Sequence, residues 1–127
     1  MKLLTFTLGL TMLGSSPALS QTNKDQTLVF GCNDLVIVGK LKNVDYHASD
    51  DPEDILGHGW VDATLSVRRV VRGGKTRSKL PVRYFAHSYM RDDRDVMLVL
   101  APQPGGVPVV RRGQLMSAHP KLAAHCE

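Results

Sequence analysis

The sequence predicts an all-β fold: a small five-stranded Greek-key barrel with little helix, preceded by a signal peptide. Five segments of alternating or β-branched apolar residues follow one another, and turn residues separate them. Gly39 interrupts the first segment, as glycines do where small barrels bend their strands. An immunoglobulin-like sandwich is the alternative, but it needs about seven strands and a core tryptophan near its disulfide. The strand count therefore favours the barrel.

The first twenty residues have the pattern of a secretory signal peptide. Lys2 gives a positive start, an apolar run covers residues 3–13, and the small residues Ala18 and Ser20 precede the expected cleavage site. A first helix that stays in the fold is the alternative, but it would need a charged face, and the segment has none. No cysteine follows the cut, so we expect no lipoprotein anchor. The expected location is secreted, in the periplasm.

The remaining 107 residues suffice for one compact domain with one core. They carry 15 basic and 12 acidic side chains, because only Lys2 of the 16 lysines and arginines precedes the cut. In that compartment nucleic acid is not an expected partner, whereas an envelope protein or an anionic envelope polymer fits. No further apolar run reaches the roughly 18 residues that cross a bilayer, so we expect no membrane span in the mature chain. We also expect a monomer. The expected division is a signal peptide (residues 1–20), a polar leader and strand entry (21–31) and the barrel domain (32–127).

Cys32 and Cys126 are the only two cysteines of the sequence. An even pair in an oxidising compartment predicts one disulfide, and this one would enclose almost the whole mature chain. The chain-entropy model assigns a loop of that length on the order of 4 kcal/mol. Metal ligation or a reactive thiol is the alternative, but no Cys-x-x-Cys motif supports either.

The first two predicted strands are long. Residues 35–44 begin as a continuous β-branched run and then alternate, which is typical of a strand buried first on both faces and later on one. An acidic loop, residues 47–59, leads to the second strand, residues 60–71. Its alternation places Val61, Ala63, Leu65, Val67 and Val71 on one face, toward the core.

Three further strands complete the predicted barrel. Glycines after residue 72 predict a hairpin with residues 79–87, and residues 96–100 form the next apolar strand. Residues 107–111 are a short last strand, at an edge because Pro108 cannot donate to a ladder. The tail, residues 114–126, is expected to hold a short helix or irregular coil.

Three segments carry a family resemblance. Cys32 stands just before residues 34–40 (DLVIVGK), residues 65–73 (LSVRRVVRG) look like a strand followed by Val-x-Lys-Gly, and residues 95–100 (DVMLVL) match a later apolar strand. Together they resemble the OB-fold of netrin-like and tissue inhibitor of metalloproteinases-like domains, over roughly residues 32–110. The resemblance implies an OB-type barrel, although Arg72 stands where lysine is commoner.

The resemblance implies the fold rather than the inhibitory mechanism. In the metalloproteinase inhibitors the mature chain begins with a cysteine whose amine and carbonyl chelate the catalytic zinc. Cleavage after Ser20 would leave Gln21 first and Cys32 inside the chain. The chelating residue therefore cannot be carried over.

Basic and aromatic side chains gather on the predicted hairpin of residues 60–87. Strands two and three of an OB barrel form its usual binding face, and Trp60 and Phe85 fall on the side that faces away from the core. The alternative is that Trp60 packs at a barrel end and the charges only keep the protein soluble. The candidate binding face is Trp60, Arg68, Arg72, Lys75, Arg77, Arg83 and Phe85.

Catalysis and metal binding have no comparable signal. The five histidines show no ligand spacing on one element, and Gly-x-Ser-x-Gly is absent. A cation site of His47 and His58 with Asp50, Asp51 or Asp54 is one reading of the acidic loop, and a solvated loop is the other. We therefore expect no catalytic residues, no metal and no cofactor.

The sequence leaves two functions of different classes. In the first, the domain is a protein-interaction or inhibitor-like module. In the second, it binds an anionic envelope polymer or oligosaccharide through the basic hairpin, and salt weakens the binding steeply. An enzyme would require a serine, a histidine and a carboxylate to converge in space.

Overall fold

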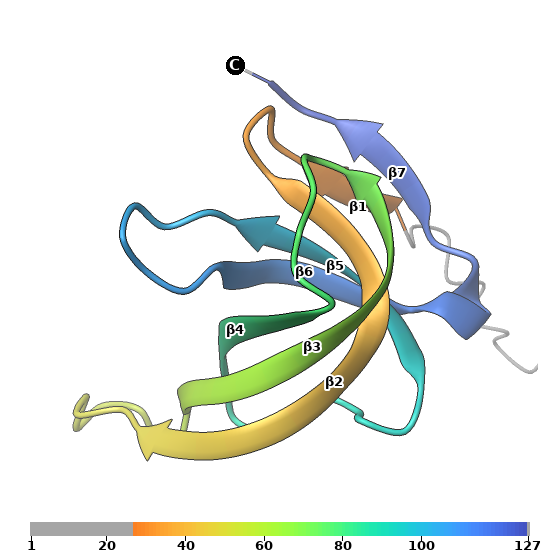
Figure 1. The fold of residues 1–127 in the computed structure, drawn as a ribbon. Coiled ribbons are helices and arrows are strands. Elements are labelled where there is room, and N and C mark those ends of the chain that lie inside the picture. The colour runs from red at the N-terminus through yellow and green to blue at the C-terminus, as the bar shows by residue number, and fades with distance from the viewer. Residues whose placement is uncertain (1–26, 127) are drawn as a thin grey trace, which may run out of the picture.

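The structure, a computed structural model, describes residues 27–126. The expected signal peptide and the polar start of the leader lie outside the described residues. Seven strands and one 3-10 helix follow one another in the described part of the chain (Figure 1). They are β1 (Thr27–Phe30), β2 (Leu35–Ala48), β3 (Gly59–Arg72), β4 (Lys79–Ala86), β5 (Asp95–Ala101), β6 (Val109–Leu115), η1 (Met116–Ala118) and β7 (Lys121–Ala124).

Five of the strands close into a barrel in the order β2-β3-β4-β6-β5. Neighbouring strands run antiparallel except β4 and β6, which are parallel and pair only at Arg83 and Val109. β6 lies between β4 and β5, although it follows both in the sequence. This is the Greek-key arrangement of an OB-type barrel. The predicted all-β, five-stranded barrel is confirmed.

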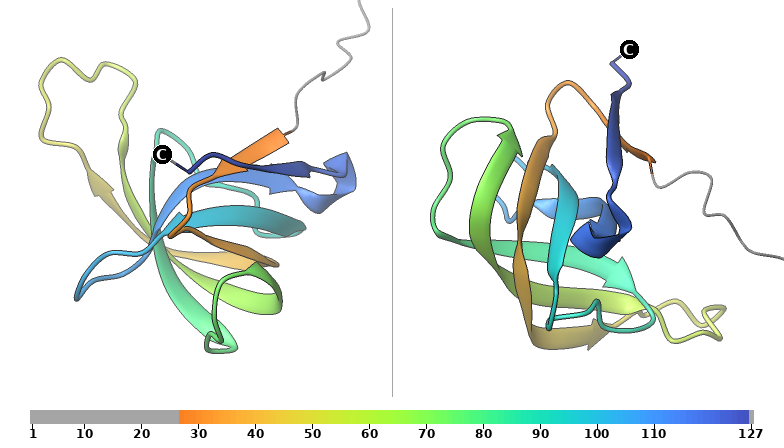
Figure 2. Two further views of the ribbon diagram at one scale, coloured as in Figure 1. Left: turned by 90° about the horizontal axis from the view of Figure 1, so that it is seen from above. Right: turned by 90° about the vertical axis from the view of Figure 1, so that its right-hand side faces the viewer.

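A second sheet, which the sequence did not predict, consists of β1 and β7 alone. The two strands run parallel, with Thr27 opposite Lys121. β7 lies in the tail that was expected to be helical or irregular, where the only helical turn is η1 (Figure 2). β6 also differs from its prediction, because it begins at Val109 and continues to Leu115. β1 and β7 have only four residues each, too few for an alternating pattern to distinguish a strand from coil in the sequence.

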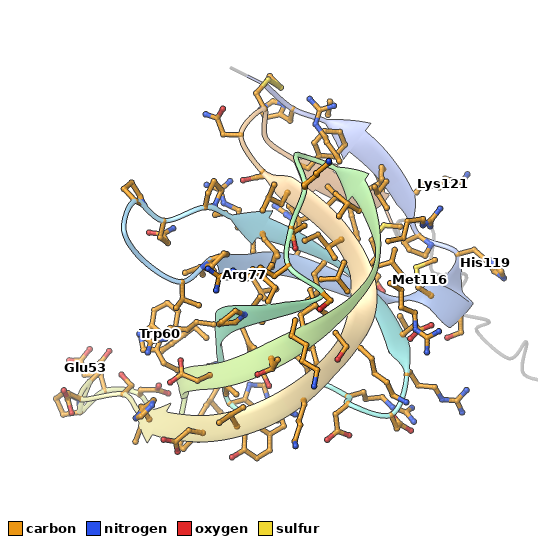
Figure 3. The ribbon with its side chains drawn as sticks, in the orientation of Figure 1. Glu53, Trp60, Arg77, Met116, His119 and Lys121 are labelled. Carbon is orange, nitrogen blue, oxygen red and sulfur yellow. A yellow bond between two sulfur atoms is a disulfide. The ribbon has the colours of Figure 1, made fainter. Side chains whose placement is uncertain are left out.

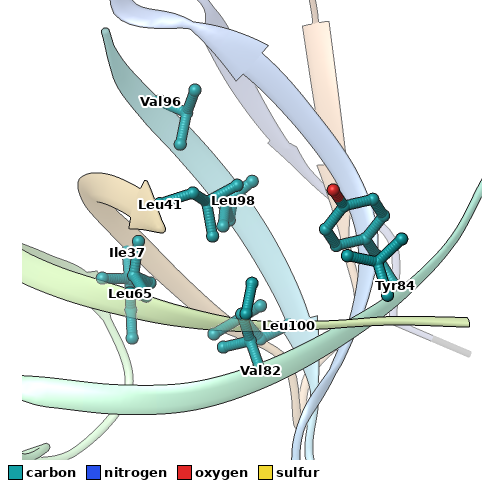
Figure 4. Packing of buried hydrophobic residues seen from close by; sticks show 10 residues of the cluster. Ile37, Leu41, Leu65, Val82, Tyr84, Val96, Leu98 and Leu100 are labelled. Carbon is teal, nitrogen blue, oxygen red and sulfur yellow. The ribbon is translucent and has the colours of Figure 1, made fainter. Parts of the chain in front are cut away.

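Two hydrophobic cores lie on opposite faces of β2 and β5. Successive residues of a strand point to opposite faces, so β2 contributes Ile37 to one core and Val36 and Val38 to the other. This confirms that the first barrel strand is buried on both faces before it becomes half-exposed. The barrel core holds Ile37, Leu41, Val61, Ala63, Leu65, Val82, Tyr84, Val96, Leu98 and Leu100 (Figure 4), and the outer core under the β1–β7 sheet holds Leu28, Phe30, Val36, Val38, Met97 and Val99.

The bend expected at Gly39 is present. The pairing of β2 with β3 shifts between Val38 and Gly39, and a Cβ atom on Gly39 would overlap the carbonyl oxygen of Ser66. The same pairing skips Arg68 and Val71. Each skip reverses the alternation of β3, so Val71 is 37% exposed and its predicted place in the core is wrong.

The predicted disulfide joins Cys32 to Cys126, with the two Cα atoms 5.2 Å apart. Cys32 follows β1 and Cys126 follows β7, so the bridge holds the two strands of the outer sheet together. The turn that carries Cys32 is fixed by Asp34, a buried carboxylate. Its Oδ2 accepts a hydrogen bond from the Gly31 amide at 2.6 Å and lies 3.6 Å from the Arg111 guanidinium.

A polar network around the buried Tyr84 side chain joins three segments of the chain. The Tyr84 hydroxyl donates to Oδ1 of Asn43 at 2.7 Å and accepts from the Met90 amide at 2.9 Å. Asn43 Nδ2 in turn donates to the Met90 carbonyl at 3.0 Å. β2, β4 and the connector before β5 are therefore joined through one side chain that is only 3% exposed. Within residues 27–126, no helix is both long and apolar enough to cross a bilayer.

Candidate binding face

The outer surface of β2, β3 and β4 carries a row of aromatic side chains. Strand pairing places His47 opposite Trp60 and Trp60 opposite Phe85. The Trp60 and Phe85 rings lie 5.3 Å apart, and the two side chains are 38% and 49% exposed. Both rings point away from the barrel core because Val61 and Tyr84, their neighbours in sequence, are buried inside it. The predicted outward position of Trp60 and Phe85 is thus what the structure shows.

A charged row lies beside the aromatic one. Arg83 Nε donates to Oδ1 of Asp62 at 2.7 Å, and His47 Nε2 lies 2.9 Å from the other oxygen of the same carboxylate. The hydrogen bond from Arg83, and then the one from His47, hold the pKa of the Asp62 carboxyl below its ordinary value. The Arg83 guanidinium also lies 5.8 Å from the centre of the Trp60 ring. Arg83 is thus neutralised by Asp62, and its charge is only partly available to a ligand.

The loop between β2 and β3, residues 49–58, is attached to this face through His58. The His58 ring stacks on Phe85 with an interplanar angle of 13°, and it meets the His87 ring edge-on. On its other side His58 Nδ1 lies 2.9 Å from Oδ1 of Asp54. The hydrogen bond to His58 holds the pKa of the Asp54 carboxyl below its ordinary value. The loop is therefore fixed to the aromatic row at its C-terminal end.

Hydrogen bonds within the loop hold its backbone in one shape. Asp54 accepts from the amides of Leu56 and His58, and Asp51 accepts from the amide of Glu53. The Ser49 amide donates to the His58 carbonyl at 3.0 Å and closes the base of the loop. Aspartates that accept from amides two residues ahead form Asx turns, which fix loops without the help of a sheet.

Two apolar side chains stand at the end of this ordered loop. Ile55 is 92% exposed and Leu56 is 67% exposed. Figure 1 shows the loop projecting from the barrel beyond the paired ends of β2 and β3, and Figure 3 shows Glu53 at its far end. An isoleucine this exposed gains almost no stabilisation from burial in its own domain. Loop positions that hold such residues in a fixed shape are where binding function concentrates.

The basic residues predicted as one face are distributed over four places, of which the Arg83 site is described above. Arg68 pairs with Asp95 at 2.9 Å, and the Arg72 guanidinium lies 4.7 Å from the centre of the Phe30 ring. Both skips in the β2–β3 pairing fall within this part of β3, so its side chains do not continue the row of Trp60 and Asp62. Lys75 and Arg77 lie at a groove near the other end of β4. The structure therefore brings together only Trp60, Arg83 and Phe85 of the candidate set.

The strongest features of the face were not among the predicted residues. Ile55 and Leu56 lie in a segment interpreted as a solvated acidic loop, and His58 and Asp54 were considered only as cation ligands. A signal was present, since Ile55 and Leu56 form an apolar pair directly after an acidic run. The (i, i+4) spacing of Asp54 and His58 was also visible, but their pairing depends on a turn that the sequence does not specify.

The histidines of the face pair with different carboxylates. His47 lies near Asp62 and Asp45, whereas His58 lies near Asp54. Among the described residues, 27 to 126, no three histidine, cysteine or acidic side chains are grouped as metal ligands. The arrangement offers apolar, aromatic and hydrogen-bonding contacts to a partner. Comparisons of the chain with models of protein families, with curated proteins and with solved structures find no match.

Proposed function

We propose that this chain is a secreted, periplasmic binding module that docks on another protein through its β2–β3 loop. Ile55 and Leu56 enter an apolar pocket of the partner, and Trp60 and Phe85 form the adjoining part of the contact. The module acts by occupying that surface, in the manner of an inhibitor or adaptor. The signal-peptide pattern of residues 1–20 and the Cys32–Cys126 disulfide support the location, because disulfides persist in oxidising compartments.

The observation that carries the proposal is the exposure of Ile55 and Leu56 in a loop that is already ordered. A loop that must be ordered on binding loses conformational entropy at that moment, whereas a pre-ordered loop does not. Aromatic anchors are also enriched where binding energy concentrates, and Trp60 and Phe85 lie at the base of this loop. These features favour a protein partner over a soluble polymer.

The charges of the loop describe the partner's surface. Asp50, Asp51 and Glu53 are exposed and precede the apolar pair in the same loop. Complementary surfaces place opposite charges around a shared apolar centre. The partner pocket is therefore apolar with a basic rim.

An anionic polymer is the second function that the sequence left open, and the arrangement of the cations supports it less. Arg68 and Arg83 each pair with a carboxylate, and Arg72 lies over an aromatic ring in another part of the barrel. A polymer that follows a basic stripe needs several unpaired cations in a row. The five basic residues of the candidate set do not form such a row.

The test compares the mature disulfide-bonded protein with two variants in an envelope extract. The double variant Ile55→Ser/Leu56→Ser removes the apolar pair of the loop, and Val44→Ser removes from β2 an apolar side chain that is about as exposed as Leu56 (65% against 67%). We expect one protein to be retained at high salt by the parent and by the Val44 variant, and to be lost with the loop variant. The same protein, once purified, should bind the loop variant at least 100-fold more weakly, since two buried hot-spot side chains contribute roughly 3 kcal/mol or more.

Folding of the variants is checked by their unfolding midpoints, which should match the parent because both sites are exposed. Equal retention by all three proteins would overturn the role of the loop. Retention that disappears at moderate salt, with no dependence on Ile55 or Leu56, would instead support the polymer-binding alternative.

A further inference from the structure

A groove with a volume of about 520 Å³ lies near the N-terminal end of β4, away from the β2–β3 loop. Its apolar wall includes Leu35, Leu80 and Val107, and the side chains of Lys75 and Arg77 line it as well. The residues that line the groove come mainly from the start of β4 and from the loop between β5 and β6. This site plays no part in the docking proposed above.

The edge of β4 that borders the groove has unpaired backbone groups. β4 pairs along its length with β3, but it pairs with β6 only at Arg83 and Val109. The Arg83 amide donates to the Pro108 carbonyl at 3.0 Å, so the backbone groups of Arg83 point away from β3. Residues two apart in a strand present their backbone groups to the same edge. Lys79 and Pro81 therefore turn theirs toward the same open edge, and Pro81 also lines the groove.

Pro81 agrees with this geometry. It lies opposite Thr64 in the β3–β4 pairing, at a position where an amide hydrogen would face the open edge and not β3. Proline is tolerated in a sheet at such edge positions. Its ring also removes one donor from the edge, which limits unwanted pairing with other strands. The Lys79 amide and carbonyl and the Pro81 carbonyl are left for a ligand.

The charge of the groove is not balanced by the protein itself. Within residues 27–126, the ion pairs of the molecule include neither Lys75 nor Arg77. Two unpaired cations beside an apolar wall favour an occupant that is both apolar and anionic. Unpaired backbone groups along a strand edge favour an occupant that is extended.

From these three observations we infer that the groove binds an extended acidic peptide segment of another protein, which adds as a short strand to the open edge of β4. Its backbone pairs with Lys79 and Pro81, its apolar side chains contact Leu80 and Val107, and its carboxylates contact Lys75 and Arg77. Backbone pairing supplies the affinity in this mode of recognition, and the side-chain contacts select the sequence.

The test uses a short, end-blocked, fluorescently labelled peptide of alternating valine and aspartate as its probe. Binding to the mature disulfide-bonded protein is followed by fluorescence anisotropy and by amide chemical shifts. We expect saturable binding with the largest shifts at Lys79, Leu80 and Val107. The double variant Lys75→Glu/Arg77→Glu should bind at least tenfold more weakly, whereas Lys121→Glu on distant β7 should bind as the parent does.

A second variant separates strand addition from simple charge attraction. Pro81→Val restores an amide donor at an exposed edge position, so it should bind the peptide roughly threefold more tightly, as one additional net hydrogen bond allows. Two further peptides are each methylated on every second backbone nitrogen, one on the odd and one on the even positions. Only one of the two should lose binding, namely the one whose methyl groups face β4.

Several results would overturn the inference. One is that a valine–lysine peptide binds as tightly as the valine–aspartate peptide. Another is that inorganic polyphosphate binds as tightly as that peptide, while neither methylation of the peptide backbone nor Pro81→Val changes the binding of the peptide. A third is the absence of saturable binding by the peptide to the parent. Peptide binding that persists in the Ile55→Ser/Leu56→Ser variant would show that the groove acts independently of the β2–β3 loop.

Discussion

Removal of the Tyr84 hydroxyl tests the polar network that joins β2, β4 and the connector before β5. In Tyr84→Phe the Met90 amide loses its acceptor and Asn43 Oδ1 loses its donor, while the ring still fills its place in the core. Each net hydrogen bond contributes about 1 kcal/mol, and a buried group left without a partner adds to that loss. We therefore expect the free energy of unfolding to fall by roughly 2–3 kcal/mol.

The assay is urea unfolding of the mature oxidised protein, with thermal unfolding in parallel. For a domain of about 100 residues, a loss of 1 kcal/mol lowers the melting temperature by roughly 4–8 °C. The expected decrease is therefore on the order of 10 °C or more. Tyr46→Phe is the matched control, because the Tyr46 hydroxyl donates to the Gly57 carbonyl at the surface. It should change stability by less than about 0.5 kcal/mol.

The pH dependence gives the same residue a second readout. Burial raises the pKa of Tyr84 above its ordinary value of 10.0, so the folded state favours the neutral phenol. This contribution to stability is fully present below pH 10.0 and is lost as the pH rises through the pKa of the folded state. Tyr84→Phe should lack this part of the alkaline decrease. The reasoning would be refuted if Tyr84→Phe and Tyr46→Phe were equally stable, or if their alkaline profiles coincided.

Two further predictions concern the disulfide and the β2–β3 loop. The double variant Cys32→Ser/Cys126→Ser should lose on the order of 4 kcal/mol of unfolding free energy, because the bridge spans 94 positions. Hydrogen exchange of this variant should show faster opening at Leu28, in the outer sheet, than in the barrel. Equal exchange in both sheets would contradict this. Asp54→Asn should be less stable than the parent near neutral pH but should lose less stability on acidification. The hydrogen bond with His58 lowers the pKa of Asp54, so the ionised carboxylate stabilises the folded state above pH 3.8, and this stabilisation is lost as the pH falls through the folded-state pKa. Urea titrations at several pH values measure both slopes, and parallel profiles would count against a role for this pair.

The barrel could be predicted from the sequence because its strands are long enough to show their burial. Residues 35–38 and 96–100 are apolar on both faces, and the structure places them between two cores. Gly39 indicated a bend, and the two cysteines indicated their bridge. Each of these signals is local to one segment or depends on composition alone.

The rest depended on contacts between distant parts of the chain. β1 and β7 pair across almost the whole described sequence, and neither strand is stable without the other and the outer core. The outward row of β3 does not continue beyond Val67, because the pairing skips Arg68 and Val71. A skipped residue changes the outward face of a strand without any change in its composition. That Ile55 and Leu56 are exposed on a loop of fixed shape depends on the turns around Asp54, which the sequence does not specify.

The parallel pairing of β1 with β7 also has a consequence for engineering. Both strands lie at one end of the molecule and the β2–β3 loop lies at the other, as Figure 1 and the right-hand view of Figure 2 show. From the end of β7 at Ala124 back to the start of β1 at Thr27, a cyclising connection would need to cross only the length of the outer sheet, roughly 13 Å for four residues of strand. Such a cyclic chain could be reopened between β4 and β5, giving a permuted domain with the same barrel, a new pair of ends, and an unaltered loop for display on a surface.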